Sequence, residues 1–141
     1  MSFYPFNKAD KILVISFDDR SLGDKMPVQD DSLVYSKIKE VKVLDKQQTD
    51  SLTDILFNIG YRGLINVLYE PACFQPRNGL VFLDRNNQVL EYVAICFECE
   101  DIALSSEKIM LGEFCTQKYA YLRRYFLSLG IRTGTLDPSK K

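Results

Sequence analysis

Short apolar runs separated by polar residues predict β-structure in the first part of the chain. Residues 11–17 (KILVISF) are mostly apolar and are followed by two aspartates, which indicates a buried strand. Residues 36–44 (SKIKEVKVL) alternate imperfectly, because Ile38 and Val41 would point to opposite faces, so we expect a bulged or edge strand. The stretch between these runs, residues 18–33, holds a glycine, a proline and five aspartates, which favours a loop.

The middle of the chain predicts a β-hairpin. Residues 80–84 and 89–97 are apolar arms on either side of residues 85–88, where an Asn-Asn pair suits a turn because asparagine tolerates positive φ. The second arm is apolar on both faces, which indicates a strand in the interior of a sheet. One face is expected to carry Val89, Val93, Ile95 and Phe97, and the other Leu90, Tyr92, Ala94 and Cys96. Residues 102–104 predict one more short strand.

Two segments have apolar residues at helical spacing and recognisable ends. The first begins at Asp45, which forms a capping-box pattern with Gln48, and ends before Gly60. The second covers residues 114–129 and ends before Gly130. The apolar positions are Leu52, Ile55, Leu56 and Ile59 in the first helix, and Cys115, Tyr119, Leu122, Phe126 and Leu129 in the second.

This order of strands and helices predicts an α+β fold, with a mainly antiparallel β-sheet and two α-helices packed on one of its faces. We expect residues 1–141 to form a single globular domain, since ~100–200 residues is a usual domain size. Residues 61–78 are expected to be irregular, with one short extended piece at residues 65–68. Residues 132–141 contain a glycine, a proline and two terminal lysines, which favours a loose C-terminal tail.

Composition and charge exclude several classes of function. The chain has 18 basic and 19 acidic side chains, so its net charge of −1 argues against a nucleic-acid or anionic-membrane partner. It has no histidine, which rules out serine–histidine and cysteine–histidine catalysis and histidine-ligated metals. We therefore expect no enzyme activity and no cofactor. The first residues lack a signal-peptide pattern and no apolar run approaches ~20 residues, so we expect a cytoplasmic protein.

Four cysteines leave more than one interpretation open: Cys73, Cys96, Cys99 and Cys115. A Cys-x-x-Cys pair with two outlying cysteines can form a four-cysteine zinc site, or the pair can act as a thiol centre. Against both, the sequence CFEC at residues 96–99 has no glycine or proline to make a tight knuckle, and its acidic surroundings disfavour a thiolate. We expect buried, inert thiols, because cysteine is among the most frequently buried residue types.

Charge is segregated along the chain although the total is nearly neutral. Residues 84–101 carry five acids and one base, whereas residues 108–132 carry five bases and one acid. Such segments can be solvated surface, or they can attract a partner of opposite charge. Acids in the first segment, together with tyrosine and arginine on the second helix, favour a protein-binding surface. The candidate partner-binding residues are Asp84, Glu98, Glu100, Asp101, Tyr121 and Arg124.

Four short motifs resemble those of a group of small bacterial proteins. They are Cys73-x-x-Pro76-Arg77, the hairpin end Ile95-Cys96-Phe97-Glu98-Cys99, Phe114-Cys115-x-x-Lys118 with Leu122 and Gly130-Ile131 after it, and Gln48-x-x-Ser51-Leu52-x-Asp54-Ile55-Leu56. The resemblance covers about residues 45–131 and transfers no catalytic residue. It implies a cognate immunity protein of a polymorphic or contact-dependent toxin, since small proteins of this kind often accompany such toxins.

The sequence thus favours a non-catalytic protein-binding module, most concretely a cytosolic immunity protein that neutralises a toxin domain, such as a nuclease, by covering its active site. An immunity protein acts through binding alone, so its specificity comes from the interface and it needs no catalytic residues. The alternative is a small metal-binding or thiol-based protein that uses Cys96 and Cys99.

Overall fold

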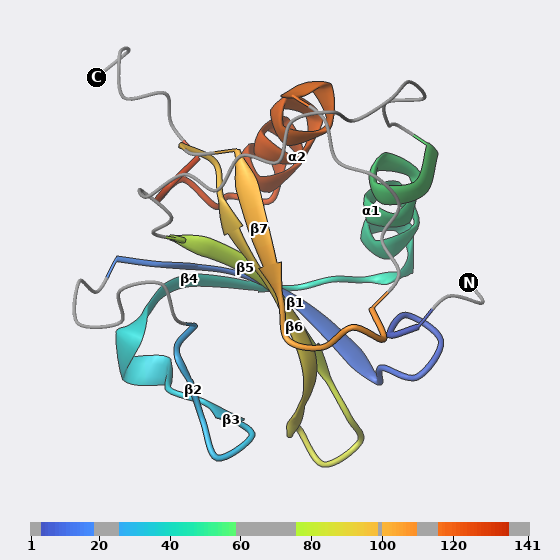
Figure 1. Cartoon of the computed structure of the whole chain (residues 1–141), viewed down its shortest axis with the longest axis vertical. Helices are drawn as coiled ribbons and strands as arrows, with labels where there is room; N and C mark the ends of the chain where they lie inside the picture. The colour runs from blue at the N-terminus through green and yellow to red at the C-terminus, as the bar shows by residue number, and fades with distance from the viewer. Residues whose placement is uncertain (1–3, 19–25, 59–75, 99, 110–115, 136–141) are drawn as a thin grey trace.

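The computed structural model describes residues 4–18, 26–58, 76–98, 100–109 and 116–135, and its central element is a five-stranded sheet. The strands lie in the order β4-β1-β5-β6-β7, and each is antiparallel to its neighbours (Figure 1). Their bounds are Lys11–Phe17 for β1, Ile38–Val43 for β4, Asn78–Leu83 for β5, Val89–Cys96 for β6 and Asp101–Leu104 for β7. The other elements are α1 (Lys46–Asn58), α2 (Thr116–Ser128), β2 (Val28–Gln29), β3 (Ser32–Leu33) and a 3-10 turn at Tyr35–Lys37. These elements confirm the predicted α+β fold.

The first helix begins as its sequence predicts. The Asp45 Oδ1 atom accepts a hydrogen bond from the Gln48 amide (2.7 Å), and the Gln48 Oε1 atom accepts one from the Asp45 amide (3.0 Å). This reciprocal capping box satisfies two amide groups that have no partner inside the helix. A cap of this kind contributes about 1 kcal/mol to stability.

Both helices pack against the same face of the sheet, as the sequence predicts (Figure 1). Leu52 and Leu56 of α1, and Leu122 and Phe126 of α2, are at most 1% exposed. The side chains beneath them come from three strands and include Val14, Leu80, Phe82, Val93 and Ile95. Full burial of one such side chain contributes ~1.5–3 kcal/mol, so this cluster holds the helix layer on the sheet.

The second face of the sheet is covered in part by the β2–β3 hairpin. Met26 and Leu33 belong to an apolar cluster whose other buried members are Leu13, Ile15, Phe17, Val81, Leu83 and Ala94. The sequence predicts a loop over residues 18–33, and that prediction is wrong for residues 28–33, which form this hairpin. Asp30 and Asp31 take φ values of 53° and 61° at its tip. Two positive φ values suit a tight hairpin turn, so these aspartates make a turn rather than a long loop.

An irregularity in β4 explains the imperfect alternation of its sequence. Glu40 pairs with Ser16 of β1. The next residue of β1, Phe17, pairs with Ile38, so β4 holds one extra residue at this point. Because of that bulge, Ile38 lies on the same face of the sheet as Val41. The predicted bulged edge strand is confirmed.

A second irregularity lies between β5 and β6. Phe82 pairs with Glu91, and the next residue of β5, Leu83, pairs with Val89. Val89 therefore packs with the cluster on the second face of the sheet, whereas Val93 belongs to the cluster under the helices. The prediction that Val89 and Val93 share a face is wrong, because the bulge reverses the alternation between them.

The chain after α2 is held against the edge strand β4. Gly130 takes a φ of 87° and ends the helix, as predicted. The Glu40 carboxylate then accepts hydrogen bonds from the amides of Arg132 (3.0 Å) and Thr133 (2.8 Å). The sequence predicts a loose tail from Arg132 onward, but the first residues of that segment are fixed by these hydrogen bonds, and Thr135 is fully buried.

Several sequence predictions fall outside the described residues and stay predictions. They concern the extended piece at residues 65–68, the helix end at Gly60, Cys73, Cys99 and Cys115, and residues 136–141. Across the part of the chain that the structure describes, no helix is long and apolar enough to cross a lipid bilayer.

Candidate functional site

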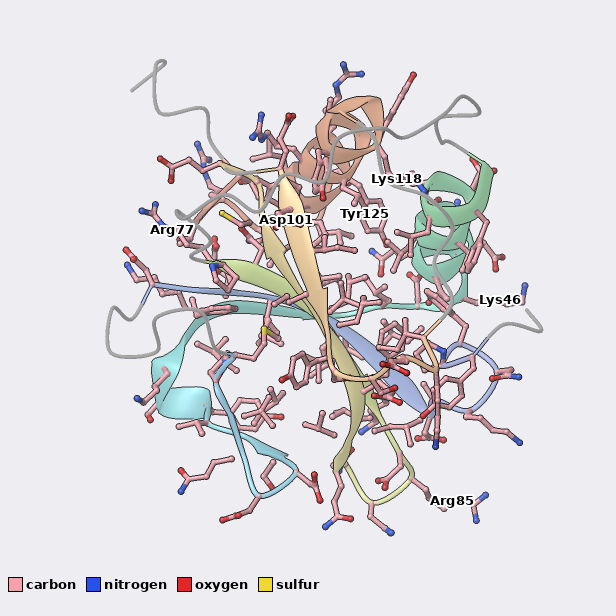
Figure 2. All side chains as sticks on the ribbon, viewed as in Figure 1. Lys46, Arg77, Arg85, Asp101, Lys118 and Tyr125 are labelled. Carbon is pink, nitrogen blue, oxygen red and sulfur yellow. The ribbon has the colours of Figure 1, made fainter. Side chains whose placement is uncertain are left out.

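Three of the predicted partner-binding acids lie together in the turn between β6 and β7: Glu98, Glu100 and Asp101, here called the acidic turn. Asp101 pairs with Cys96 at the base of the turn. Glu98 and Glu100 are exposed, whereas Asp101 is half-buried and its Oδ1 atom accepts a hydrogen bond from the Ile102 amide (2.8 Å). Figure 2 shows Asp101 toward the end of the molecule where α2 lies. The acidic turn therefore gathers three carboxylates at one end of the sheet.

The acidic turn is attached to α2 through Arg123. The Arg123 Nη2 atom donates a hydrogen bond to the Phe97 carbonyl (3.2 Å), and the guanidinium carbon lies 5.5 Å from the centre of the Phe97 ring. The Phe97 ring packs edge-on against Phe126, with 5.4 Å between the ring centres. Sequence reasoning placed Arg123 in a basic segment but missed this role. The one sequence feature that could have indicated this role is the position of Arg123, one helical turn before the apolar Phe126.

Tyr121 and Arg124, the two candidates on α2, contact each other. The Arg124 guanidinium carbon lies 5.4 Å from the centre of the Tyr121 ring, and Tyr121 is 41% exposed. Tyr125 instead faces α1, where its hydroxyl donates a hydrogen bond to the Gln48 carbonyl (2.6 Å). Burial, and then the charge of Asp45, raise the pKa of Tyr125. Tyr121 and Arg124 therefore form an exposed pair on α2, whereas Arg123 and Phe126 join that helix to Phe97 beside the acidic turn.

Asp84 does not join the acidic turn. It lies in the β5–β6 hairpin turn, at the opposite end of β6 (Figure 1). Its Oδ1 atom accepts hydrogen bonds from the amides of Asn86 (2.8 Å) and Gln88 (3.0 Å). Asn87 in the same turn has a φ of 63°, as the Asn-Asn pair predicts. The Asp84 side chain therefore stabilises the hairpin turn.

A buried carboxylate that sequence reasoning did not select as a site residue, Glu91, anchors the N-terminal segment. Glu91 is 6% exposed and accepts hydrogen bonds from the hydroxyls of Ser105 (2.5 Å), Tyr4 (2.7 Å) and Ser106 (2.8 Å). Burial raises the pKa of Glu91, but these hydrogen bonds and the charge of Lys108 outweigh burial and leave the pKa below its usual value. The hydrogen bond to Glu91 also raises the pKa of Tyr4 to about 12. The network gives Glu91 a structural role.

Glu40 has a comparable role on the edge strand β4. Its Oε1 atom accepts hydrogen bonds from the Ser16 hydroxyl (2.6 Å) and from the amides of Arg132 (3.0 Å) and Thr133 (2.8 Å). Burial raises the pKa of Glu40, but the hydrogen bonds together leave it below its usual value. Glu40 is therefore an ionised, positioned carboxylate on β4.

Cys96 is the one cysteine within the described residues, and it is a buried cysteine on β6 that forms no disulfide bond. The other three cysteines of the candidate zinc site lie outside the described residues: Cys73, Cys99 and Cys115. In the described ranges, no group of three or more His, Cys, Asp and Glu side chains is placed to hold a metal ion. The zinc and thiol alternatives stay predictions that metal analysis can test.

The second face of the sheet is hollowed beside the edge strand β4. A groove of about 440 Å³ is lined by Lys11, Leu13, Ser32, Leu33, Tyr35, Val41, Val43, Leu83 and Asn87. Three of these side chains, here called the β4 patch, are strongly exposed: Tyr35 (61%), Val41 (47%) and Val43 (54%). Exposed apolar residues that gather in this way commonly mark an interaction surface. The β4 patch and the acidic turn lie at opposite edges of the sheet.

Comparisons of the chain with protein-family models, with curated proteins and with solved structures find no match.

Proposed function

We propose that this protein is a non-catalytic protein-binding module, an immunity protein that neutralises a bacterial toxin domain by binding it. The observation that carries the proposal is the attachment of the exposed acidic turn to α2 through Arg123 and Phe97. A turn whose base is fixed before binding loses little conformational entropy in a complex, so it suits recognition. The resemblance of the four motifs to those of small bacterial proteins indicates that the partner is a toxin.

The charge of the acidic turn indicates which partner surface it fits. Glu98 and Glu100 are exposed, and Asp101 adds a third carboxylate beside them. Nucleases bind phosphate with basic residues, so the acidic turn is opposite in charge to such a cleft. Charges of opposite sign also speed the encounter of two proteins at low salt. A toxin nuclease with a basic cleft is therefore the partner class that this surface supports best.

Exposed apolar and aromatic side chains on β7 and α2 are available to extend the proposed interface. Leu104 of the edge strand β7 is 41% exposed, and it lies on the helix face of the sheet because it pairs with Val93. Tyr121 and Leu127 are 41% and 37% exposed on α2. Protein interfaces usually combine apolar and aromatic contacts with a charged rim, so these side chains can contribute contacts beside the acidic turn.

A survival assay tests the proposal. The C-terminal domain of the reading frame immediately upstream of the gene would be expressed in a heterologous bacterial host, with and without this protein. We expect the domain alone to stop growth and the protein to restore it. If the upstream domain is not toxic, or if it remains toxic beside the folded protein, the immunity function is wrong.

Charge-reversal variants then test the acidic turn itself. Glu98→Lys/Glu100→Lys is expected to slow association with the toxin domain by about tenfold or more at low salt, with little change in melting temperature. The matched control is Asp10→Lys/Glu107→Lys, which makes the same charge change at two other exposed acids. Equal association rates for the two double variants would show that the acidic turn is solvated surface outside the interface.

A further inference from the structure

The edge strand β4 carries a second surface that the proposed function does not use. β4 pairs with β1 on one side and has no strand neighbour among the described residues on the other. Exposed apolar edge strands tend to pair with another chain, because their outer backbone groups and side chains lack partners. The exposed Val41 and Val43 of the β4 patch are on this edge. The strand sequence and its register allow the partner to be identified.

The register with β1 determines which backbone groups of β4 point outward. The Leu44 amide donates a hydrogen bond to the Ile12 carbonyl (3.0 Å), so these opposed residues form a hydrogen-bonded pair. In an antiparallel ladder such pairs alternate with pairs that exchange no hydrogen bonds. Val43 lies opposite Leu13, one position along, so the amide and carbonyl of Val43 point away from β1, and those of Val41 do the same. β4 therefore offers outward amide and carbonyl groups from its two exposed valines.

We propose that β4 pairs antiparallel with β4 of a second copy of this chain, around a two-fold axis at Val41. In this register Val41 lies opposite Val41 of the second copy, and Glu40 lies opposite its Lys42. The neighbouring registers that keep both sheets facing the same way are unfavourable. One opposes Glu40 to Glu40, and the other opposes Lys42 to Lys42, and like charges opposite each other destabilise a strand pair. Charge complementarity between Glu40 and Lys42 therefore favours a second copy of this chain as the partner of β4, in the register centred on Val41.

The side chains on both faces of the strand fit this arrangement. Hydrogen bonds from Ser16, Arg132 and Thr133 to its Oε1 atom already hold the Glu40 carboxylate in place. Its Oε2 atom accepts from the Arg132 amide (3.0 Å) and retains capacity for an ammonium group. Each dimer would therefore contain two symmetric Glu40–Lys42 pairs on the helix face. On the other face the two Val41 side chains would meet between the two grooves.

The dimer goes beyond the proposed function and does not compete with it. β4 and β7 are the two opposite edges of the sheet, so pairing through β4 leaves the acidic turn and Leu104 accessible. A two-fold dimer of this kind would present two acidic turns and could bind two partner molecules.

Sedimentation velocity of the full chain, from about 1 to 200 µM, tests self-association. We expect a reversible monomer–dimer equilibrium in the wild type. Lys42→Glu places a glutamate opposite Glu40 of the other copy, once on each side of the two-fold axis. This like-charge pairing should weaken dimerisation by about tenfold or more. The matched control Lys46→Glu makes the same charge change at an exposed side chain of α1, away from β4. This variant should dimerise like the wild type. A wild type that stays monomeric throughout, or equal dimerisation of the two variants, would overturn the proposal.

Cysteine substitution tests the register independently of charge. Opposed residues of a hydrogen-bonded pair have Cα atoms ~5.5 Å apart, which a disulfide can bridge. Val41→Cys should therefore give a covalent dimer under mild oxidation, beyond any background that the native cysteines give in the wild type. Val43→Cys is the control, since its two copies would lie about 13 Å apart along the strands. The register would be wrong if Val43→Cys formed a covalent dimer as efficiently as Val41→Cys, through a disulfide between the two copies of residue 43.

Discussion

Replacement of Glu91 is the sharpest test of how the N-terminal segment is held to the sheet. The carboxylate is 6% exposed and accepts hydrogen bonds from Tyr4, Ser105 and Ser106. A hydrogen bond to a charged group contributes ~1.5–3 kcal/mol, but these three share one acceptor group and are not additive. We therefore expect Glu91→Ala to lower the free energy of unfolding by ~3–5 kcal/mol, as for other broken buried charge networks. The matching fall in melting temperature is about 10–17 °C, because unfolding entropy is ~2.1 cal/mol/K per residue.

Glu91→Gln separates the charge from the shape of this side chain. Glutamine keeps one accepting oxygen and nearly the same volume, so we expect a smaller cost of ~1–2 kcal/mol at pH 7. The folded-state pKa of Glu91 lies below its usual value of 4.5, so its ionised form stabilises the protein above that pH. The stabilisation is lost as pH falls through the lowered pKa. Wild type and Glu91→Gln should therefore converge in stability below about pH 4.5.

Urea denaturation followed by circular dichroism, at pH 7 and at several lower pH values, measures these differences. Two results would refute the reasoning about Glu91. One is a loss of less than about 1 kcal/mol in Glu91→Ala, which would mean that water replaces the three hydroxyl partners without cost. The other is a constant gap between wild type and Glu91→Gln at all pH values, which would mean that the charge of Glu91 contributes nothing.

Two further predictions concern backbone conformation and metal. Gly134 has a φ of 80° and a Cβ there would collide with Asn78, whereas Gly130 has a φ of 87° and open space around it. Gly134→Ala should therefore cost ~2 kcal/mol or more and Gly130→Ala ~1 kcal/mol by denaturant titration; equal costs would contradict the collision. If the cysteines are inert thiols, chelator should leave the melting temperature unchanged, and elemental analysis should find no stoichiometric zinc. One zinc per chain would favour the four-cysteine zinc site instead.

Elements governed by local pattern could be predicted from the sequence. The capping residues Asp45 and Gln48 indicated the start of α1 in advance, since both partners of each hydrogen bond lie within four consecutive residues. The β5–β6 hairpin followed from two apolar arms around an Asn-Asn turn. The acidic turn was also predictable, because its three carboxylates are close together in sequence and follow a buried strand.

Features that depend on distant partners were missed. Glu91 meets Tyr4 across 87 positions of sequence, and nothing near Glu91 distinguishes it from a solvated acid. Arg123 reaches Phe97 across 26 positions, and its helical periodicity does not show which carbonyl it binds. The face of Val89 was wrong because one bulge reverses an alternation that the sequence alone shows as regular. Each error has the same physical origin, since long-range packing selects partners that local pattern does not specify.

Calorimetric titration of this protein into the purified toxin domain of the upstream reading frame tests the central claim most directly. We predict saturable binding at one site per chain, with a Kd of about 1 µM or tighter. The affinity should fall for Glu98→Lys/Glu100→Lys and stay unchanged for Asp10→Lys/Glu107→Lys. No measurable binding at about 100 µM of either folded protein would contradict the proposed immunity function.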